Sequence, residues 1–515
     1  MRPAHSLATG VAQVQLDQFL SDLNIYLTYC YGDCKTCRTA APRRPRVRFA
    51  TSDLLHWQAA CCGYTAVLTL ANQEPSTTLH VMMSKTRVLA VAIVALAAAS
   101  RPAQPYAVFT HEAVIDSTWD LIKQVLLTRF PTATPADLKQ AHAFAYGGCV
   151  IQDMGYYPMG SHYFSDLVHY ARSGDFVMAL WRDAQNLNEA AFALGALAHY
   201  SSDSHGHPIG VNRAVALEYP ALRSKYGDEV TYAEDPSVHL KTEFGFDVIQ
   251  VAQGHYAPQD YHDFIGFQVS QELLERAFGD TYSIELQKQF KDLNLALGTY
   301  RRTVSGILPE ATKLAWVLKR KEIVKARPGI TKRTFLYNLS RASYEKEWGR
   351  QYEHIGFFQH VFAWVVEILP KVGPLKTLAF KPPTARTETL FMKSFNQTLD
   401  SYRASLRALN TGQLQLVNLD FDTGRPTRPG EYSLADETYA KLLRQLAAQD
   451  FRDITPELRA NLMTFYQDPR SLQNDVPKRG KKERKDWAAT MQALEKLRAL
   501  TPPAPAAVAA AHRPT

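Results

Sequence analysis

Four polar residues interrupt an apolar helical pattern near the middle of the chain. The segment "LGALAHYSSDSHGHPIG", residues 194–210, contains His199, Asp203, His205 and His207. On an α-helix, residues four apart lie about 40° around the axis from one another, so His199 and Asp203 project from one face. An imidazole and a carboxylate on one helix face can bind the same metal ion.

A second pair of candidate ligands repeats this spacing, because His239 precedes Glu243 by four residues. His207 follows Asp203 by four residues and could reach a second ion beside the first. Imidazole and carboxylate ligands without thiolates are typical of zinc in hydrolytic sites, with iron and manganese as alternatives. One such pair is often only a hydrogen-bonded pair, but two pairs and a further candidate within 45 residues predict a metal centre.

Helices must position these side chains. From residue 109 onward, apolar residues recur at steps of three and four, as in "HEAVIDSTWDLIKQVLL" and "VSQELLERAF", and strand-like alternation is nearly absent. We therefore predict an all-α protein. A multi-helix bundle is expected over residues 106–300, followed by an α-helical C-terminal extension or second domain over residues 301–500.

Four segments, in this order, resemble motifs of the zinc-dependent phospholipase C family. They are "FTHEAVIDSTWD", "GGCVIQDMGYYPMGSHYFSD", "LGALAHYSSDSHGHP" and "VHLKTEFGFD". The superfamily also contains single-strand-specific zinc nucleases and a phospholipase D that acts on glycosylphosphatidylinositol anchors. The resemblance covers about residues 106–250, and it implies the all-α bundle of this family with two or three bound zinc ions.

The resemblance also implies which residues bind the ions. The ligands of one ion would be Asp153, His162, His199 and Asp203. The ligands of a second ion would be His207, His239 and Glu243. Asp203 would bridge toward a third ion that His111 also binds.

Two positions leave an alternative open. The family's phospholipases and nucleases place the last histidine of the HxxxD motif where this chain has Ile209, whereas the anchor-cleaving phospholipase D resembles this chain at His207. His205 is the substitute if His207 points away. His169 of "DLVHY" competes with His162, and we prefer His162 because "SHYFSD" fits the family loop better.

The chemistry implied by the resemblance is phosphodiester hydrolysis. Clustered zinc ions bind phosphate oxygens and lower the pKa of a bound water, which generates hydroxide as the nucleophile. Asp153 could orient or deprotonate that water. The expected substrate is a glycerophospholipid, which implies peripheral membrane contact. The alternatives are a single-strand nuclease and a non-catalytic exported helical binding protein.

The segment "MSKTRVLAVAIVALAAASRPAQ" is typical of a secretory signal peptide, and a buried internal helix is the alternative. Its apolar stretch, residues 88–99, is shorter than the ~20 residues that span a bilayer. We therefore predict a signal peptide and linker over residues 83–105 and a secreted or periplasmic protein. Residues 1–82 would then be a non-native leader, and the Pro/Ala-rich residues 501–515 a disordered tail.

Charge and cysteine content limit the other function classes. The 58 basic and 50 acidic residues give a formal charge of +8 that is spread along the whole chain, so composition does not indicate a stable nucleic-acid partner. Five of the six cysteines lie within residues 1–82, and only Cys149 follows them. No disulfide framework is therefore expected after residue 82.

Overall fold

A computed structural model of the chain describes residues 108–253, 265–304, 321–322, 324–325, 380–467 and 481–500. All of them belong to the second of the two units into which the chain divides, Val81–Thr515. The predicted leader, signal peptide and C-terminal tail lie outside the described residues. These three predictions therefore remain expectations.

Helices dominate the described residues, and the predicted all-α fold is confirmed. The first helices are α3 (Val108–Arg129), α4 (Pro135–Cys149), the 3₁₀ helix η1 (Ile151–Tyr156), α5 (His162–Tyr170), α6 (Ser173–Asp183) and α7 (Leu187–His205). Next come the π-helix η2 (Gly206–Val211), α8 (Asn212–Glu218), α9 (Pro220–Tyr226), α10 (Pro236–Gln253), α12 (Gln271–Tyr282), the 3₁₀ helix η3 (Gln287–Gln289) and α13 (Leu293–Arg302).

The C-terminal part of the described chain contains four helices and a short hairpin. Its elements are α18 (Ala385–Asn410), β1 (Leu419–Asp420), β2 (Arg425–Pro426), α19 (Ser433–Ala448), α20 (Pro456–Phe465) and α21 (Lys481–Ala499). The strands pair antiparallel, with Leu419 opposite Pro426 and Asp420 opposite Arg425. They are the only strands among the described residues.

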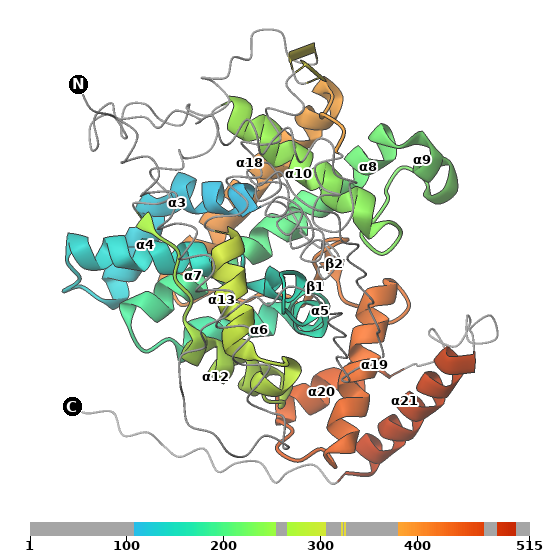
Figure 1. Ribbon diagram of the computed structural model, residues 1–515. Helices are drawn as coiled ribbons and strands as arrows, with labels where there is room; N and C mark the ends of the chain where they lie inside the picture. The colour runs from blue at the N-terminus through green and yellow to red at the C-terminus, as the bar shows by residue number, and fades with distance from the viewer. Residues whose placement is uncertain are drawn as a thin grey trace, which may run out of the picture. The chain divides into compact units, whose positions relative to one another are not determined.

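Helix α7 is the central element, because every residue from Glu189 to Ser204 is buried. Helices α3, α4, α6 and α18 all pack against it, and Figure 1 shows α3 and α4 beside α7. Gly195 permits the close approach of α4, since a Cβ atom at this position would lie 2.2 Å from the carbonyl oxygen of Ala145. The buried faces of these helices form one continuous hydrophobic core.

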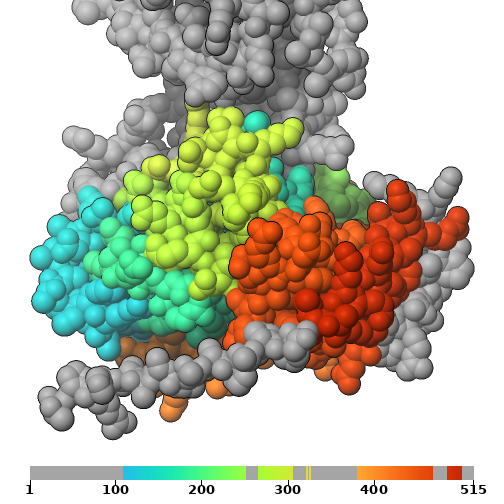
Figure 2. All heavy atoms as spheres, turned by 90° about the horizontal axis from the view of Figure 1, so that it is seen from below, coloured from blue at the N-terminus to red at the C-terminus, as the bar shows by residue number. Residues whose placement is uncertain are grey.

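The C-terminal elements pack directly on the earlier helices. Helix α18 contacts α3, α7 and η2, and Tyr402 on α18 donates a buried hydrogen bond of 2.9 Å to the carbonyl of Leu194. The hairpin contacts α5 and α6, and α19 contacts α5. The side chain of Gln445 on α19 donates to that of Gln289 at 3.2 Å. Figure 2 shows the C-terminal elements, in orange and red, against the yellow-green helices that precede them. None of the described helices combines the length and the apolar character that a membrane-spanning helix requires.

Candidate metal centre

The first group of candidate ligands lies where η1, α5 and α7 meet. Its members are Asp153, His169, His199 and Asp203, all of them buried. The Nε2 atom of His199 lies 3.0 Å from Oδ2 of Asp203 and 3.4 Å from Nε2 of His169. Oδ1 of Asp153 lies 3.1 Å from Nε2 of His169 and 3.7 Å from Nε2 of His199.

Backbone carbonyls determine which nitrogen of each ring faces the group. Nδ1 of His199 lies 3.0 Å from the carbonyl oxygen of Cys149, and Nδ1 of His169 lies 2.8 Å from that of Ser165. A carbonyl only accepts, so each Nδ1 carries the proton and donates it. Each ring therefore turns Nε2 toward the group, which is the arrangement found in metal-binding histidines.

The four side chains fit a divalent cation. Tetrahedral zinc with bonds of about 2.0–2.1 Å places its ligand atoms roughly 3.4 Å apart, and the contacts in this group measure 3.0–3.7 Å. Both oxygens of Asp153 and Asp203 are buried and accept no hydrogen bond from the described residues. Two buried carboxylates this close together are unfavourable without a positive charge between them.

The second group lies where η2 and α10 meet. Nδ1 of His207 lies 2.8 Å from Nε2 of His239 and 3.5 Å from Oε1 of Glu243. Nε2 of His239 lies 3.0 Å from the same glutamate oxygen. All three side chains are buried, and the two glutamate oxygens accept no hydrogen bond from the described residues. These atoms also fit a cation with imidazole and carboxylate ligands.

The π-helical turn η2 positions His207. Gly206 and Pro208 predict the end of the helix that carries His199, but the chain continues directly from α7 into Gly206–Val211. A π-turn is wider than an α-turn and occurs frequently at functional sites. His205, the alternative ligand, belongs to neither group of described residues. Its Nδ1 lies 2.9 Å from the carbonyl oxygen of Ser201.

Two further histidines approach Asp203. Nε2 of His111 lies 3.4 Å from Oδ1 of Asp203, and the His111 ring stacks on that of His199 with centroids 4.4 Å apart. Nε2 of His207 lies 3.6 Å from Oδ2 of Asp203. Histidine nitrogens therefore approach both oxygens of this carboxylate. Helix α3, which carries His111, is anchored to α10 where Thr110 donates to Asp247 at 2.8 Å.

The structure places His169, not His162, in the first group. His162 is the first residue of α5 and is exposed, with its ring 5.5 Å from that of Tyr156. His169 follows seven residues later, which moves it about 10 Å along the helix axis while keeping it on nearly the same face. The distance along the helix, rather than the helix face, therefore separates the two candidates, and the structure brings His169 rather than His162 to Asp153, His199 and Asp203.

One acidic residue of the centre has no counterpart in the sequence analysis. Asp422, in the turn between β1 and β2, is 2% exposed and forms a group with His207 and His239. It lies 179 residues after Glu243, and its segment "DFDTG" contains no histidine at helical spacing. The only available signal was a pair of aspartates in a polar turn, which is common on protein surfaces.

Burial and neighbouring charges shift the pKa values of these groups in different directions. Burial raises the pKa of Glu243 well above its ordinary range, and the nearby carboxylates of Asp203 and Asp153 raise it further. Burial alone would also raise the pKa of Asp203, but His199 and His207 outweigh burial and hold this pKa well below its ordinary range. Several buried carboxylates thus compete for few positive charges, as expected where a cation binds.

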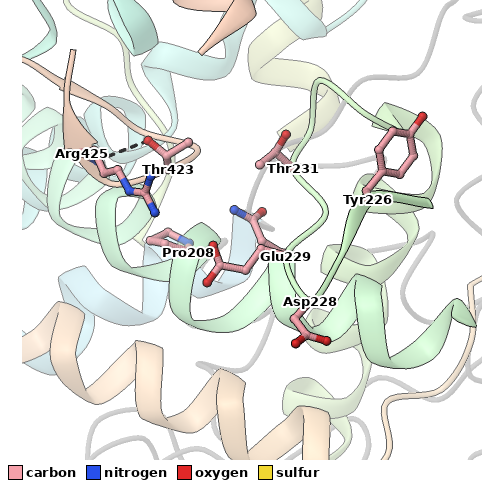
Figure 3. Close-up of a pocket in the computed structure, with 8 residues that line it drawn as sticks. Pro208, Tyr226, Asp228, Glu229, Thr231, Thr423 and Arg425 are labelled. Carbon is pink, nitrogen blue, oxygen red and sulfur yellow. Dashed lines mark hydrogen bonds between the residues drawn. The ribbon is translucent and has the colours of Figure 1, made fainter. Parts of the chain in front are cut away.

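A pocket of about 440 Å³ (Figure 3) is lined in part by residues that directly follow His207 and Asp422 in the sequence. Its lining includes Pro208, which follows His207, and Thr423, which follows Asp422. The remaining lining is mostly polar and contains the charged side chains of Asp228, Glu229 and Arg425. The two acidic side chains pair with arginines, since Glu229 lies 3.0 Å from Arg213 and Asp228 lies 2.6 Å from Arg223.

The helical fold brings together two buried groups of imidazole and carboxylate side chains whose geometry suits metal ions. Residues 110–292 match the family model described as zinc dependent phospholipase C, and this domain belongs to that family. The chain therefore contains a phospholipase C-like hydrolase domain of a zinc-dependent type. Comparison with curated proteins and with solved structures gave no significant match.

Proposed function

We propose that this protein is an exported zinc metallohydrolase that acts as a phospholipase C on glycerophospholipids. It would break the P–O bond on the glycerol side, which releases diacylglycerol and a phosphorylated head group. The observation that carries the proposal is the pair of buried ligand groups linked through Asp203 and His207, within a domain of the zinc dependent phospholipase C family.

When bound, zinc ions would bind the phosphate oxygens and lower the pKa of a water that attacks phosphorus. His169, His199 and Asp203 would hold the first ion together with Asp153. His207, His239 and Glu243 would hold the second. His111 and Asp203 together offer ligands for a third ion, as the family resemblance implies.

Asp153 is the proposed general base. It lies in η1 and belongs to the first group, and neither of its oxygens accepts a hydrogen bond from the described residues. With one oxygen directed at His169, the other could orient the attacking water and accept its proton. That proton would then pass to the glycerol oxygen as the P–O bond breaks.

The pocket beside the second group supports a polar head group over a nucleic-acid base. Base recognition on single strands relies on stacking against aromatic faces, which contributes about 1–3 kcal/mol per base. Among the described residues that line this pocket, Tyr226 is the only aromatic one. Its other side chains are suited to hydrogen bonds and charge, as a phosphorylated head group requires.

Export is the second part of the proposal and rests on the signal-like segment at residues 83–99. The mature protein would begin after residue 96 and lack residues 1–82. Mass spectrometry of the secreted protein should yield peptides only from the later part of the chain. Peptides from residues 1–82 in the secreted material would contradict export by this segment.

A single purification tests the catalytic part. Protein prepared without chelator should contain at least two zinc ions per chain by elemental mass spectrometry. It should hydrolyse a short-chain phosphatidylcholine and release phosphocholine, but leave single-stranded DNA intact. Hydrolysis of the DNA alone would replace the proposal with a nuclease. Bound zinc without either activity would favour the non-catalytic binding protein.

A further inference from the structure

We propose that Asp422 is a ligand of the second metal ion, so that the C-terminal hairpin completes a centre whose other ligands lie within the family domain. The inference rests on the metal centre of the proposed function and extends it beyond residues 110–292. Oδ1 of Asp422 lies 3.5 Å from Nδ1 of His207 and 4.0 Å from Nε2 of His239. Glu243 approaches the same two nitrogens.

Hydrogen bonds hold one oxygen of Asp422 and leave the other directed at the group. Oδ2 accepts from the backbone N–H of Tyr232 at 2.8 Å and from the hydroxyl of Tyr432. Oδ1 is buried and accepts no hydrogen bond from the described residues. Metal-binding carboxylates are commonly oriented in this way by hydrogen bonds to their second oxygen.

The hairpin is shaped to bring Asp422 to this position. Asp420 accepts hydrogen bonds from the backbone N–H groups of Asp422 at 3.0 Å and Thr423 at 3.2 Å, which closes the turn. Gly424 has φ +67°, and a Cβ atom there would lie 2.4 Å from the carbonyl oxygen of Ser204. The turn therefore lies directly against the end of α7, and only glycine fits this contact.

Contacts at Asp422 and Phe421 hold the hairpin against α8 and against the first group. Asn212, which begins α8, donates through its side chain to the carbonyl of Asp422 at 2.8 Å. Phe421 packs its ring 5.3 Å from that of His169 and 6.0 Å from that of His199. Its backbone N–H donates to the carbonyl of His169 at 3.3 Å. The hairpin thus covers the first group while it supplies a carboxylate to the second.

Charge balance favours two carboxylates in each group. In the first group, the ionised side chains of Asp153 and Asp203 match the charge of one divalent cation. In the second, Glu243 alone would leave one uncompensated positive charge in a buried site. Asp422 supplies the second negative charge, and a buried site is most favourable when its charges are paired.

Metal content provides the direct test. The Asp422→Asn variant keeps the size of the side chain and removes its charge. After dialysis against a graded series of a zinc chelator, we expect this variant to lose one zinc ion per chain at a chelator concentration at least about 10-fold lower than the wild type. The matched control is Asp453→Asn, which makes the same change at an exposed position and should retain zinc like the wild type.

Two further variants keep the test decisive if Asp422→Asn folds poorly. Tyr432→Phe keeps Asp422 but removes one hydrogen bond to Oδ2, and should weaken the second zinc ion less than Asp422→Asn does. The second is a double variant that combines Asp422→Asn with His207→Ala. It should lose no more zinc than His207→Ala alone, because Asp422 and His207 would bind the same ion.

The possible results separate this inference from the proposed function. If Asp422→Asn binds zinc with the same affinity and stoichiometry as the wild type, the proposed role of Asp422 is overturned and the phospholipase proposal stays intact. Loss of one zinc from Asp422→Asn together with no lipase activity in the wild type would support Asp422 and refute the phospholipase. Absence of zinc from the wild type would overturn both.

Discussion

His207 and Asp203 connect the two ligand groups of this protein. Nε2 of His207 lies 3.6 Å from Oδ2 of Asp203, whereas Nδ1 of the same ring lies 2.8 Å from Nε2 of His239 in the second group. One imidazole therefore contacts both groups through its two nitrogens. Loss of charge in one group should consequently disturb cation binding in the other.

The Asp203→Asn variant should show this coupling most clearly. The substitution preserves side-chain size but removes the charge that His111, His199 and His207 all approach. We expect it to lose more than one zinc ion per chain and to reduce turnover of phosphatidylcholine by about 10²-fold or more. Elemental analysis and an activity assay on the same preparation measure both effects. Full zinc content with near-normal turnover would refute the multi-zinc centre.

His162 and His169 give a paired comparison on one helix. His169→Ala should remove the first zinc ion and the activity, because the ring lies between Asp153 and His199. His162→Ala should leave the zinc content unchanged, since the side chain is exposed outside both groups. Isothermal titration calorimetry of zinc into the two zinc-free variants distinguishes them. Equal loss in both variants would contradict the placement of α5.

Gly424→Ala should displace the hairpin. The new Cβ atom would lie 2.4 Å from the carbonyl oxygen of Ser204 and 3.0 Å from Cγ of Pro208, at a φ of +67°. Gly412→Ala is the matched control, because its φ is +70° but nothing lies within 4 Å of the added atom. Backbone strain alone costs on the order of 1–3 kcal/mol in each variant. In urea unfolding, Gly424→Ala should lose clearly more stability than the control, and it should also bind zinc more weakly.

Stability should depend on pH in opposite directions with and without zinc. Burial alone would lower the pKa of His169, but Asp153 and Asp203 outweigh burial and raise that pKa from 6.5 to about 10 in the zinc-free protein. The folded zinc-free protein then keeps a proton that the unfolded state releases, so its stability should fall as the pH rises from 6.5 toward 10. Burial raises the pKa of Glu243 and acts in the same direction.

Zinc must displace these protons, so the zinc-loaded protein should become more stable over the same pH range. Melting temperatures measured at pH 7, 8 and 9, with chelator and with added zinc, test the two signs. Without zinc, the melting temperature of the His169→Ala variant should depend less on pH than that of the wild type. Parallel slopes in the two forms of the wild type would show that zinc does not bind these titrating groups.

Local spacing was sufficient to predict the helices and most of the side chains that the structure brings together in the two groups. His199 with Asp203, and His239 with Glu243, lie four residues apart on helices, and each pair faces one group in the structure. The helical period is a property of neighbouring residues, so it can be read from a short segment. For the same reason, apolar residues at steps of three and four predicted the all-α fold, which is confirmed.

Only the tertiary structure decided which residues complete each group. His162 and His169 lie on nearly the same face of α5, so their distances from Asp153 depend on how far η1 reaches along that helix. Asp422 joins His207 across more than 200 residues, because the hairpin packs against α5 and the end of α7. Contacts at such separations arise from the packing of whole elements, so they cannot be predicted from the spacing of residues within a short segment.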